Sequence, residues 1–176
     1  SLYESRSGER GMFSRAAAKK QVAVNGRRNP DHEFGTNPCC EIILRPNQFC
    51  NLTEVVVKKD DTEETLKKKV KLAAILGTYQ ATLTDFKYLR KIWADTTEEE
   101  RLLGVSMTGI MDNELTNGGE GDLDSMLQRL RKVAVDTNEV WADSLGIPQS
   151  TAITCVKPSG TVSQLVDAAS GIHPRH

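Results

Sequence analysis

Two long helical patterns alternate with short apolar segments in the second half of the chain, and this alternation restricts the possible folds more than any other feature. Apolar residues recur at helical spacing through residues 61–84 and again through residues 123–145. Residues 103–110 and 151–156 are short runs with the composition of buried strands. Strands that alternate with helices of this length predict an α/β architecture with mostly parallel strands. The pattern leaves open whether the sheet is open or closes into a barrel.

The rest of the chain predicts shorter elements. These are a loop at 1–11, a helix at 12–24, a loop at 25–36, strands at 39–44 and 49–57 around a turn at 45–47, helical turns at 85–93 and a short capped helix at 97–103. No internal repeat or low-complexity segment interrupts them.

Composition narrows the class of protein. The 176 residues, 38% of them hydrophobic, are enough for one domain with a core. The net charge of -1 predicts no nucleic-acid partner, and the absence of a long apolar run predicts no membrane partner. The four cysteines include no Cys-x-x-Cys pair, which favours a reducing, cytoplasmic compartment over a disulfide framework.

An amide, a thiol and a carboxylate occupy alternate positions at Asn37, Cys39 and Glu41. Pro38 disfavours a helical Asn37, so we expect an extended backbone in which these three side chains share one side. Cys40 would then point away from them. A thiol between a proton acceptor and an amide suits covalent or radical chemistry on a polar ligand. The alternative is an edge strand with a buried, inert cysteine.

A second candidate site is the turn Pro158-Ser159-Gly160-Thr161, between a predicted strand and a predicted helix. Gly160 permits close approach of the backbone, and the first amides of a helix have no partner within it. These amides, with the hydroxyls of Ser159 and Thr161 and the charge of Lys157, predict a phosphate-binding loop. The alternative is a capped turn with no ligand.

Three motifs occur in order: Asn-Pro-Cys-x-Glu-Ile from Asn37, Phe-Cys-Asn-Leu-Thr-Glu around Cys50, and Lys-Pro-Ser-Gly-Thr from Lys157. Together they resemble the catalytic subunit of ribonucleotide reductases, and most closely the adenosylcobalamin-dependent class II enzymes. The resemblance extends from about Ser7 to the last residue. One departure is Cys40, which stands where that class usually has glycine.

This resemblance implies a fold and an extent. The fold is the family's ten-stranded α/β barrel, with residues 33–47 as a central finger loop that carries the radical cysteine, and residues 157–162 as the phosphate loop. Because the family's subunit is several times longer, we expect residues 1–176 to be an internal fragment of the catalytic barrel.

The resemblance also implies roles for the residues of the finger loop. Cys39 is the radical-bearing thiol, which takes the ribose 3′ hydrogen. Glu41 is the base for the 3′-hydroxyl, and Asn37 holds the 2′ or 3′ oxygen. Pro158, Ser159, Gly160 and Thr161 bind the substrate phosphates.

Cys50 is implied to be one of two thiols that supply the reducing electrons and end as a disulfide. The family's partner cysteine lies upstream of this segment. Cys40 and Cys155 are candidates within the chain, although neither is at the family's position, and Cys155 has the simplest interpretation as a core strand residue.

The implied function is reduction of ribonucleoside di- or triphosphates to deoxyribonucleotides for DNA synthesis. The cofactor is adenosylcobalamin, with no assigned binding residues. The partners are the ribonucleotide, a thioredoxin-type reductant, and nucleotide effectors that bind elsewhere. No metal site is expected, because Cys39, Cys40, Cys50, Cys155, His173 and His176 fit no zinc-binding spacing. The alternatives are a reductase whose radical comes from a metal-carrying partner subunit, a nucleotide-binding module without turnover, and a structural α/β domain.

Overall fold

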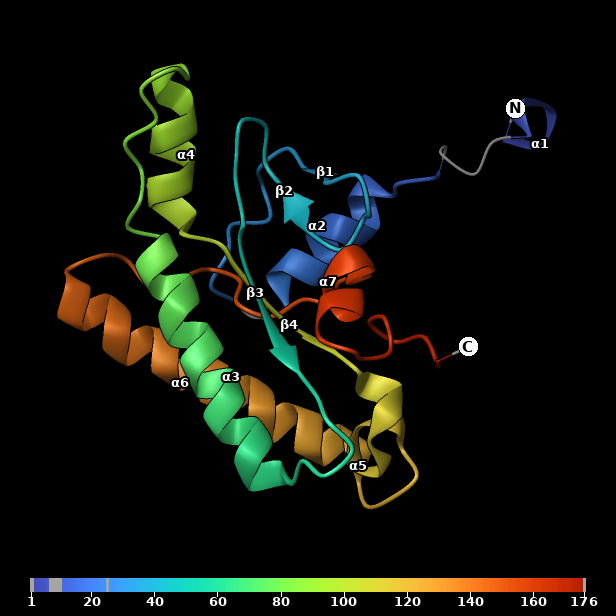
Figure 1. The fold of residues 1–176 in the computed structure, drawn as a ribbon. Coiled ribbons are helices and arrows are strands. Elements are labelled where there is room, and N and C mark those ends of the chain that lie inside the picture. The colour runs from blue at the N-terminus through green and yellow to red at the C-terminus, as the bar shows by residue number, and fades with distance from the viewer. Residues whose placement is uncertain (1, 7–10, 25, 176) are drawn as a thin grey trace.

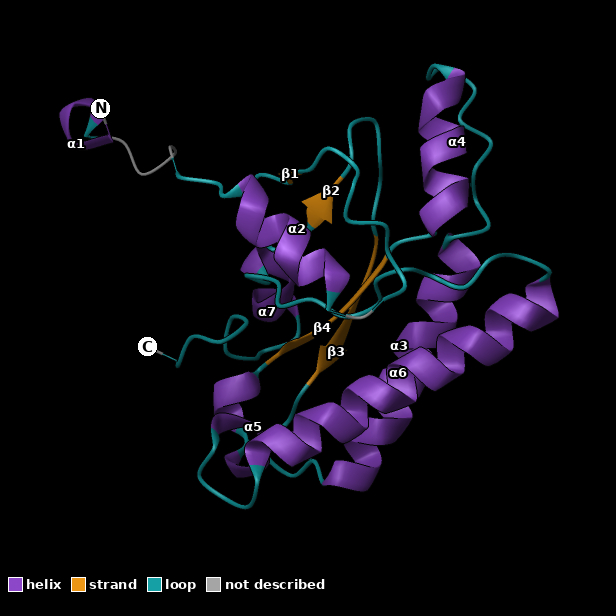
Figure 2. Ribbon diagram, turned by 180° about the vertical axis from the view of Figure 1, so that it is seen from behind, coloured by secondary structure: helices purple, strands orange, loops and turns teal. Residues whose placement is uncertain are grey.

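The computed structural model describes residues 2–6, 11–24 and 26–175. Within them a short parallel sheet lies at the centre, two long helices cover one side, and a small hairpin with two shorter helices lies on the other (Figures 1 and 2). The predicted α/β class is confirmed. The ten-stranded barrel is not shown, because the described residues form two sheets of two strands each.

The two long helices, α3 (Glu63–Gln80) and α6 (Leu123–Leu145), pack against each other as the periodicity predicts. A capping box between Thr62 and Thr65 begins α3, and the Asp122 carboxylate caps the first turn of α6. Gly146 ends α6 in a left-handed conformation that glycine adopts without strain. Their apolar faces share one core with the sheet, which includes Leu66, Val70, Ala74, Leu130, Ala134, Val55 and Val105.

The central sheet consists of β3 (Asn51–Val56) parallel to β4 (Leu103–Thr108), with Asn51 opposite Leu103. Both match predicted strands, and almost every residue of β4 is buried. The predicted strand at 151–156 is reduced to one bridge, between Thr154 and Val105. The amides of Leu103 and Val105 bond to the carbonyls of adjacent residues, Ala152 and Ile153, so a regular ladder cannot continue.

The hairpin pairs β1 (Gly35–Thr36) with β2 (Ile43–Leu44) in antiparallel register. Helix α2 (Arg15–Ala23), which lies within the helix predicted at 12–24, buries Ala18 and Val22 against Phe34 beside the hairpin. This second, smaller core fixes the hairpin on the side of the sheet away from α3 and α6 (Figure 1).

Several shorter predictions need correction. Helix α1 (Leu2–Ser5) lies inside the predicted loop 1–11, of which residues 1 and 7–10 lie outside the described residues. One helix, α4 (Lys91–Glu100), replaces the predicted helix at 97–103, because Arg101 ends it in a left-handed conformation before the predicted end. A short 3-10 turn η1 (Ile110–Asp112) and α5 (Glu114–Asn117) connect β4 to α6, and α7 (Gly160–Leu165) follows the candidate phosphate loop as predicted.

Across the described residues, no helix combines the length and apolar character needed to cross a membrane.

Candidate active site

A tight turn connects β1 to β2 and presents the predicted radical cysteine. The amide of Cys40 donates to the Asn37 carbonyl at 3.0 Å, and the amide of Ile42 donates to the Asn37 side-chain oxygen at 3.0 Å. Pro38 is favoured at the second position of such a turn because its φ is already fixed there. The predicted strand at 39–44 is therefore wrong for residues 39–42, and the extended alternation proposed for Asn37, Cys39 and Glu41 does not occur.

The three predicted residues of the turn have different environments. The thiols of Cys39 and of its neighbour Cys40 are exposed at the tip. Glu41 is half-buried, and its Oε2 atom is buried without a hydrogen-bond partner in the described part of the chain. An unpaired buried carboxylate oxygen is costly, so it is an acceptor available to a ligand.

Glu41 faces a cavity of about 210 Å³ between the hairpin, the start of β4 and the segment around residue 153. Cys50 and Cys155 line the same cavity. The structure thus brings Glu41 and Cys50 to one cavity, and Cys155, which the sequence suggested as a core strand residue and as one candidate partner of Cys50, lines it too.

Gly104 explains how the two sulfurs meet across β4. A Cβ atom at Gly104 would lie 3.2 Å from the Cys50 sulfur and 3.1 Å from the Cys155 sulfur. The missing side chain leaves the space that both thiols occupy. Sequence reasoning missed this residue, although an isolated glycine inside a strand is a signal of close approach.

Both thiols are held in the protonated form. Burial, with smaller effects from Cys155 and Glu41, raises the pKa of Cys50 to about 12, and the positive charge of Arg28 opposes this. Burial and then Glu41 raise the pKa of Cys155 to about 12. A thiol that stays protonated at neutral pH is a weak nucleophile but retains the S–H hydrogen.

The candidate phosphate loop is held in a specific shape. Ser159 is buried with a φ of 65°, and its hydroxyl donates to Thr108 Oγ1 at 2.6 Å. The Ser170 hydroxyl donates to the Pro158 carbonyl at 2.7 Å. The Ser159 hydroxyl is therefore used inside the protein, while Gly160 and Thr161 are exposed at the start of α7. Those two residues leave backbone amides and one hydroxyl for a ligand.

No group of three or more metal-ligating side chains occurs within residues 2–6, 11–24 and 26–175. The ring of His173 contacts the Ser170 carbonyl at 3.1 Å, and His176 lies outside the described residues.

No family model matches the chain. A relative from Lacticaseibacillus paracasei, named adenosylcobalamin-dependent ribonucleoside-triphosphate reductase, is 31% identical across 96% of this chain. A relative of the same name from Euglena gracilis is 31% identical across 85% of it. A solved structure is similar with a TM-score of 0.65 and 32% identity over 79% of the chain. The fold and these relatives define the class as the ribonucleotide reductases.

Within that class, the solved structure is a B12-dependent, class II ribonucleotide reductase, and both relatives are named as adenosylcobalamin-dependent enzymes. The resemblance predicted from the three motifs is confirmed: the chain is similar to a segment of the class II enzymes. It spans 26% of the L. paracasei relative, 20% of the Euglena relative and 22% of the solved chain.

Proposed function

We propose that this chain is part of an adenosylcobalamin-dependent ribonucleotide reductase, an oxidoreductase that converts ribonucleoside di- or triphosphates to 2′-deoxyribonucleotides for DNA synthesis. The observation that supports it best is the cavity beside the hairpin turn, where the unpaired Glu41 carboxylate and the protonated Cys50 thiol lie together. The named relatives act on ribonucleoside triphosphates, which favours the triphosphate.

Cys39, Glu41 and Asn37 have different roles in the reaction of the ribose. Cys39, as a thiyl radical, takes the 3′ hydrogen, and Glu41 accepts the proton of the 3′-hydroxyl through its unpaired Oε2. Asn37 uses its side-chain oxygen inside the turn, so its NH₂ group is the part that holds a ribose oxygen.

The 2′-hydroxyl leaves as water, and the ribose gains two electrons and two protons. The Cys39 thiol then returns the hydrogen atom to C3′ and becomes a thiyl radical again, and Glu41 returns the proton to the 3′ oxygen. Cys50 supplies one of the two thiols, the other coming from outside this chain, and the pair ends as a disulfide. A thioredoxin-type reductant then returns both to thiols by disulfide exchange. The raised pKa of Cys50 suits its reduction of the ribose, because the S–H hydrogen is retained until the substrate takes it.

The exposed Cys39 thiol is compatible with a radical-generating cofactor. The Cys39 thiol is exposed at the turn, so a hydrogen atom can be removed from it by a group that approaches from outside the described residues. When bound, adenosylcobalamin supplies one-electron radical chemistry. No described residue is assigned to hold it.

The remaining parts of the proposal concern binding and location. The exposed amides of Gly160 and Thr161 hold the substrate phosphates, in the turn shaped by Pro158 and Ser159. Nucleotide effectors bind through parts of the enzyme beyond this chain, and the enzyme acts in the cytoplasm. The relatives are all named for adenosylcobalamin, so a radical from a metal-carrying partner subunit is the less favoured alternative.

The test is Cys39→Ser in a full-length reductase that carries this segment, with Cys40→Ser as the matched control. Serine is nearly isosteric, but its O–H bond is too strong to give up the hydrogen. We expect turnover to fall at least a thousandfold in Cys39→Ser with nucleotide affinity unchanged, while Cys40→Ser retains turnover. Deoxynucleotide formation by Cys39→Ser at a tenth of the normal rate would exclude the radical role.

Cys50→Ser forms a second arm of this experiment. It should still release the 3′ hydrogen from labelled substrate but fail to complete reduction with a thioredoxin-type donor. Normal turnover of Cys50→Ser with that donor would make Cys50 a packing residue.

A further inference from the structure

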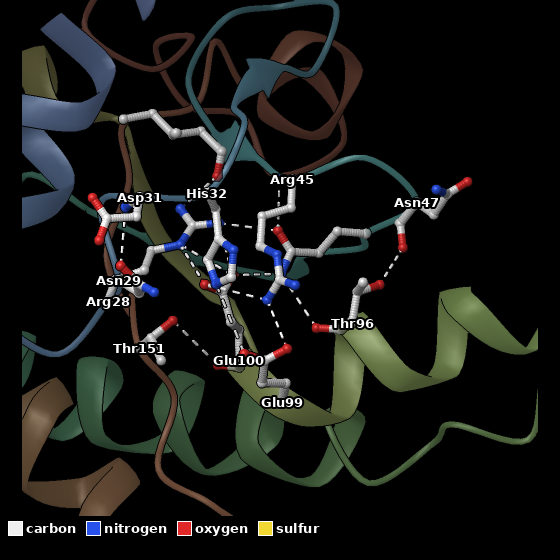
Figure 3. Close-up of polar contacts among 12 residues, drawn as sticks. Arg28, Asn29, Asp31, His32, Arg45, Asn47, Thr96, Glu99, Glu100 and Thr151 are labelled. Atoms are coloured by element: carbon white, nitrogen blue, oxygen red, sulfur yellow. Dashed lines mark hydrogen bonds and ion pairs between the residues drawn. The ribbon is translucent and has the colours of Figure 1, made fainter. Parts of the chain in front are cut away.

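A buried arginine connects the hairpin to the end of α4. The Nε atom of Arg28 donates to both carboxylate oxygens of Glu100 at 3.0 Å, and Nη2 donates to Oε2 at 2.8 Å. The side chains of Arg28 and Glu100 are 4% and 3% exposed. Figure 3 shows Arg28 reaching this carboxylate from the segment between α2 and β1.

The same guanidinium holds β2 and the segment that follows it. Nη1 donates to the backbone carbonyl of Ile43 in β2 at 2.7 Å, and Nη2 donates to the side-chain oxygen of Gln48 at 3.0 Å. That Gln48 oxygen also accepts from the amide of Arg45 at 2.9 Å, and the Gln48 amide group donates to Glu100. All three nitrogens of the Arg28 guanidinium therefore donate hydrogen bonds, to Glu100, to Ile43 or to Gln48.

This geometry is specific to arginine. The planar guanidinium presents donors in a fixed fork, whereas a lysine ammonium is a single point charge that cannot reach Glu100, Ile43 and Gln48 together. Arg28 also lies over the ring of Phe34, 4.9 Å from its centre, immediately before β1. Removal of one member of such a buried pair leaves an unpaired charge, which is more costly than removal of both.

The clamp, by which we mean Arg28 with Glu100 and Gln48, also borders the candidate active site. Arg28 lines the same cavity as Glu41 and Cys50, and its charge acts on the Cys50 thiol. The side chain that holds Ile43 and Gln48 therefore also lines the cavity that contains Cys50.

We propose that Arg28 is a positioning residue: by fixing β2 and Gln48 to Glu100, it holds the Asn37–Glu41 turn over Cys50. The positioning role is inferred from the contacts of Arg28 and does not depend on the proposed function. The consequence for turnover rests on the proposed function.

The test uses the double variant Arg28→Met with Glu100→Gln, which removes both charges and leaves an acceptor for Gln48. Hydrogen exchange is measured at the hairpin amides of Cys40 and Ile42 and, in the same sample, at the β4 amide of Val105. We expect at least tenfold faster exchange at the hairpin amides and less than twofold change at Val105. The rate of Cys50 alkylation should rise severalfold, because the turn no longer covers the thiol.

Two further variants make the outcome decisive. Arg28→Lys keeps the charge, and we expect it to loosen the hairpin as the double variant does. Arg15→Met with Glu33→Gln removes an exposed ion pair beside the same hairpin, with 3.8 Å between Nη1 and Oε2, and should change nothing. Unchanged hairpin exchange in the double variant, or equal loss of protection at Val105, would overturn the positioning role.

A full-length reductase that carries the segment separates this inference from the proposed function. Arg28→Lys should there lower kcat at least tenfold with KM unchanged. Loosened hairpin amides in an enzyme without reductase activity would support the clamp and refute the function. Normal kcat in Arg28→Lys would refute the role in turnover.

Discussion

Cys40 has a backbone conformation that few residues other than glycine adopt. Its φ is 63°, in the left-handed region, directly after the turn formed by Pro38 and Cys39. There the Cβ atom crowds the following carbonyl, at a cost of about 1–2 kcal/mol. The structure thus gives a physical reason to expect glycine at this position, as the resemblance to the class II enzymes implies. The turn forms despite this strain because the amides of Ile42 and Cys40 donate to the side-chain and backbone oxygens of Asn37.

Replacement of Cys40 by glycine should stabilise the chain. Relief of the left-handed strain exceeds the entropy that glycine adds to the unfolded state, so we expect the free energy of unfolding to rise by about 0.5–1 kcal/mol. The measurement is urea denaturation followed by circular dichroism. Cys39→Gly is the control, since Cys39 has no positive φ, and it should lower stability instead. A loss of stability in Cys40→Gly would show that the thiol contributes more than the strain costs.

At the scale of elements, the sequence predicts the helices that a local residue pattern encodes. It misses the contacts that form between segments distant in the sequence. The helix at 123–145 matches α6 residue for residue, because its apolar face and both of its caps are encoded locally. The strand predicted at 39–44 is mostly wrong, because the turn-forming tendency of Asn37 and Pro38 overrides the apolar run that follows. The approach of Cys50 and Cys155 to β4 depends on the absence of a side chain at Gly104. An isolated strand glycine signals a close approach, but the local pattern does not say which distant segments make it.

Gly104→Ala tests whether β4 needs this gap. The new Cβ would meet the Leu52 side chain at 2.4 Å and both sulfurs at under 3.3 Å. Leu52 can move, but both sulfurs also crowd the new atom, so we expect a loss of about 1–3 kcal/mol in the free energy of unfolding. Gly35→Ala in β1, where nothing lies within 4 Å of the new atom, is the matched control and should leave stability within about 0.5 kcal/mol. Equal effects of the two substitutions would contradict the packing described for Gly104.

In the whole molecule, the described residues cover the candidate site on one side and leave the tip of the hairpin exposed. Strand β3 has a partner strand on one edge, β4, within the described residues. The hairpin base is fixed to α4 through Arg28 and Glu100, whereas the thiols of Cys39 and Cys40 at its tip are exposed. A thiyl radical requires shelter from water and from other thiols, and this arrangement provides anchoring without shelter.

The 176-residue chain by itself should therefore form no deoxyribonucleotide. We expect no product above a protein-free blank when the chain is incubated with adenosylcobalamin, a dithiol reductant and a ribonucleoside triphosphate. The L. paracasei relative, of which this chain spans 26%, is the positive control under identical conditions. Hydrogen exchange on the same sample should show protected amides in β4, α3 and α6, whose shared core is complete, so that inactivity is not mistaken for unfolding. Product formation by the chain alone would mean that the exposed tip of the hairpin needs no further walls, and that the described residues already contain a working site.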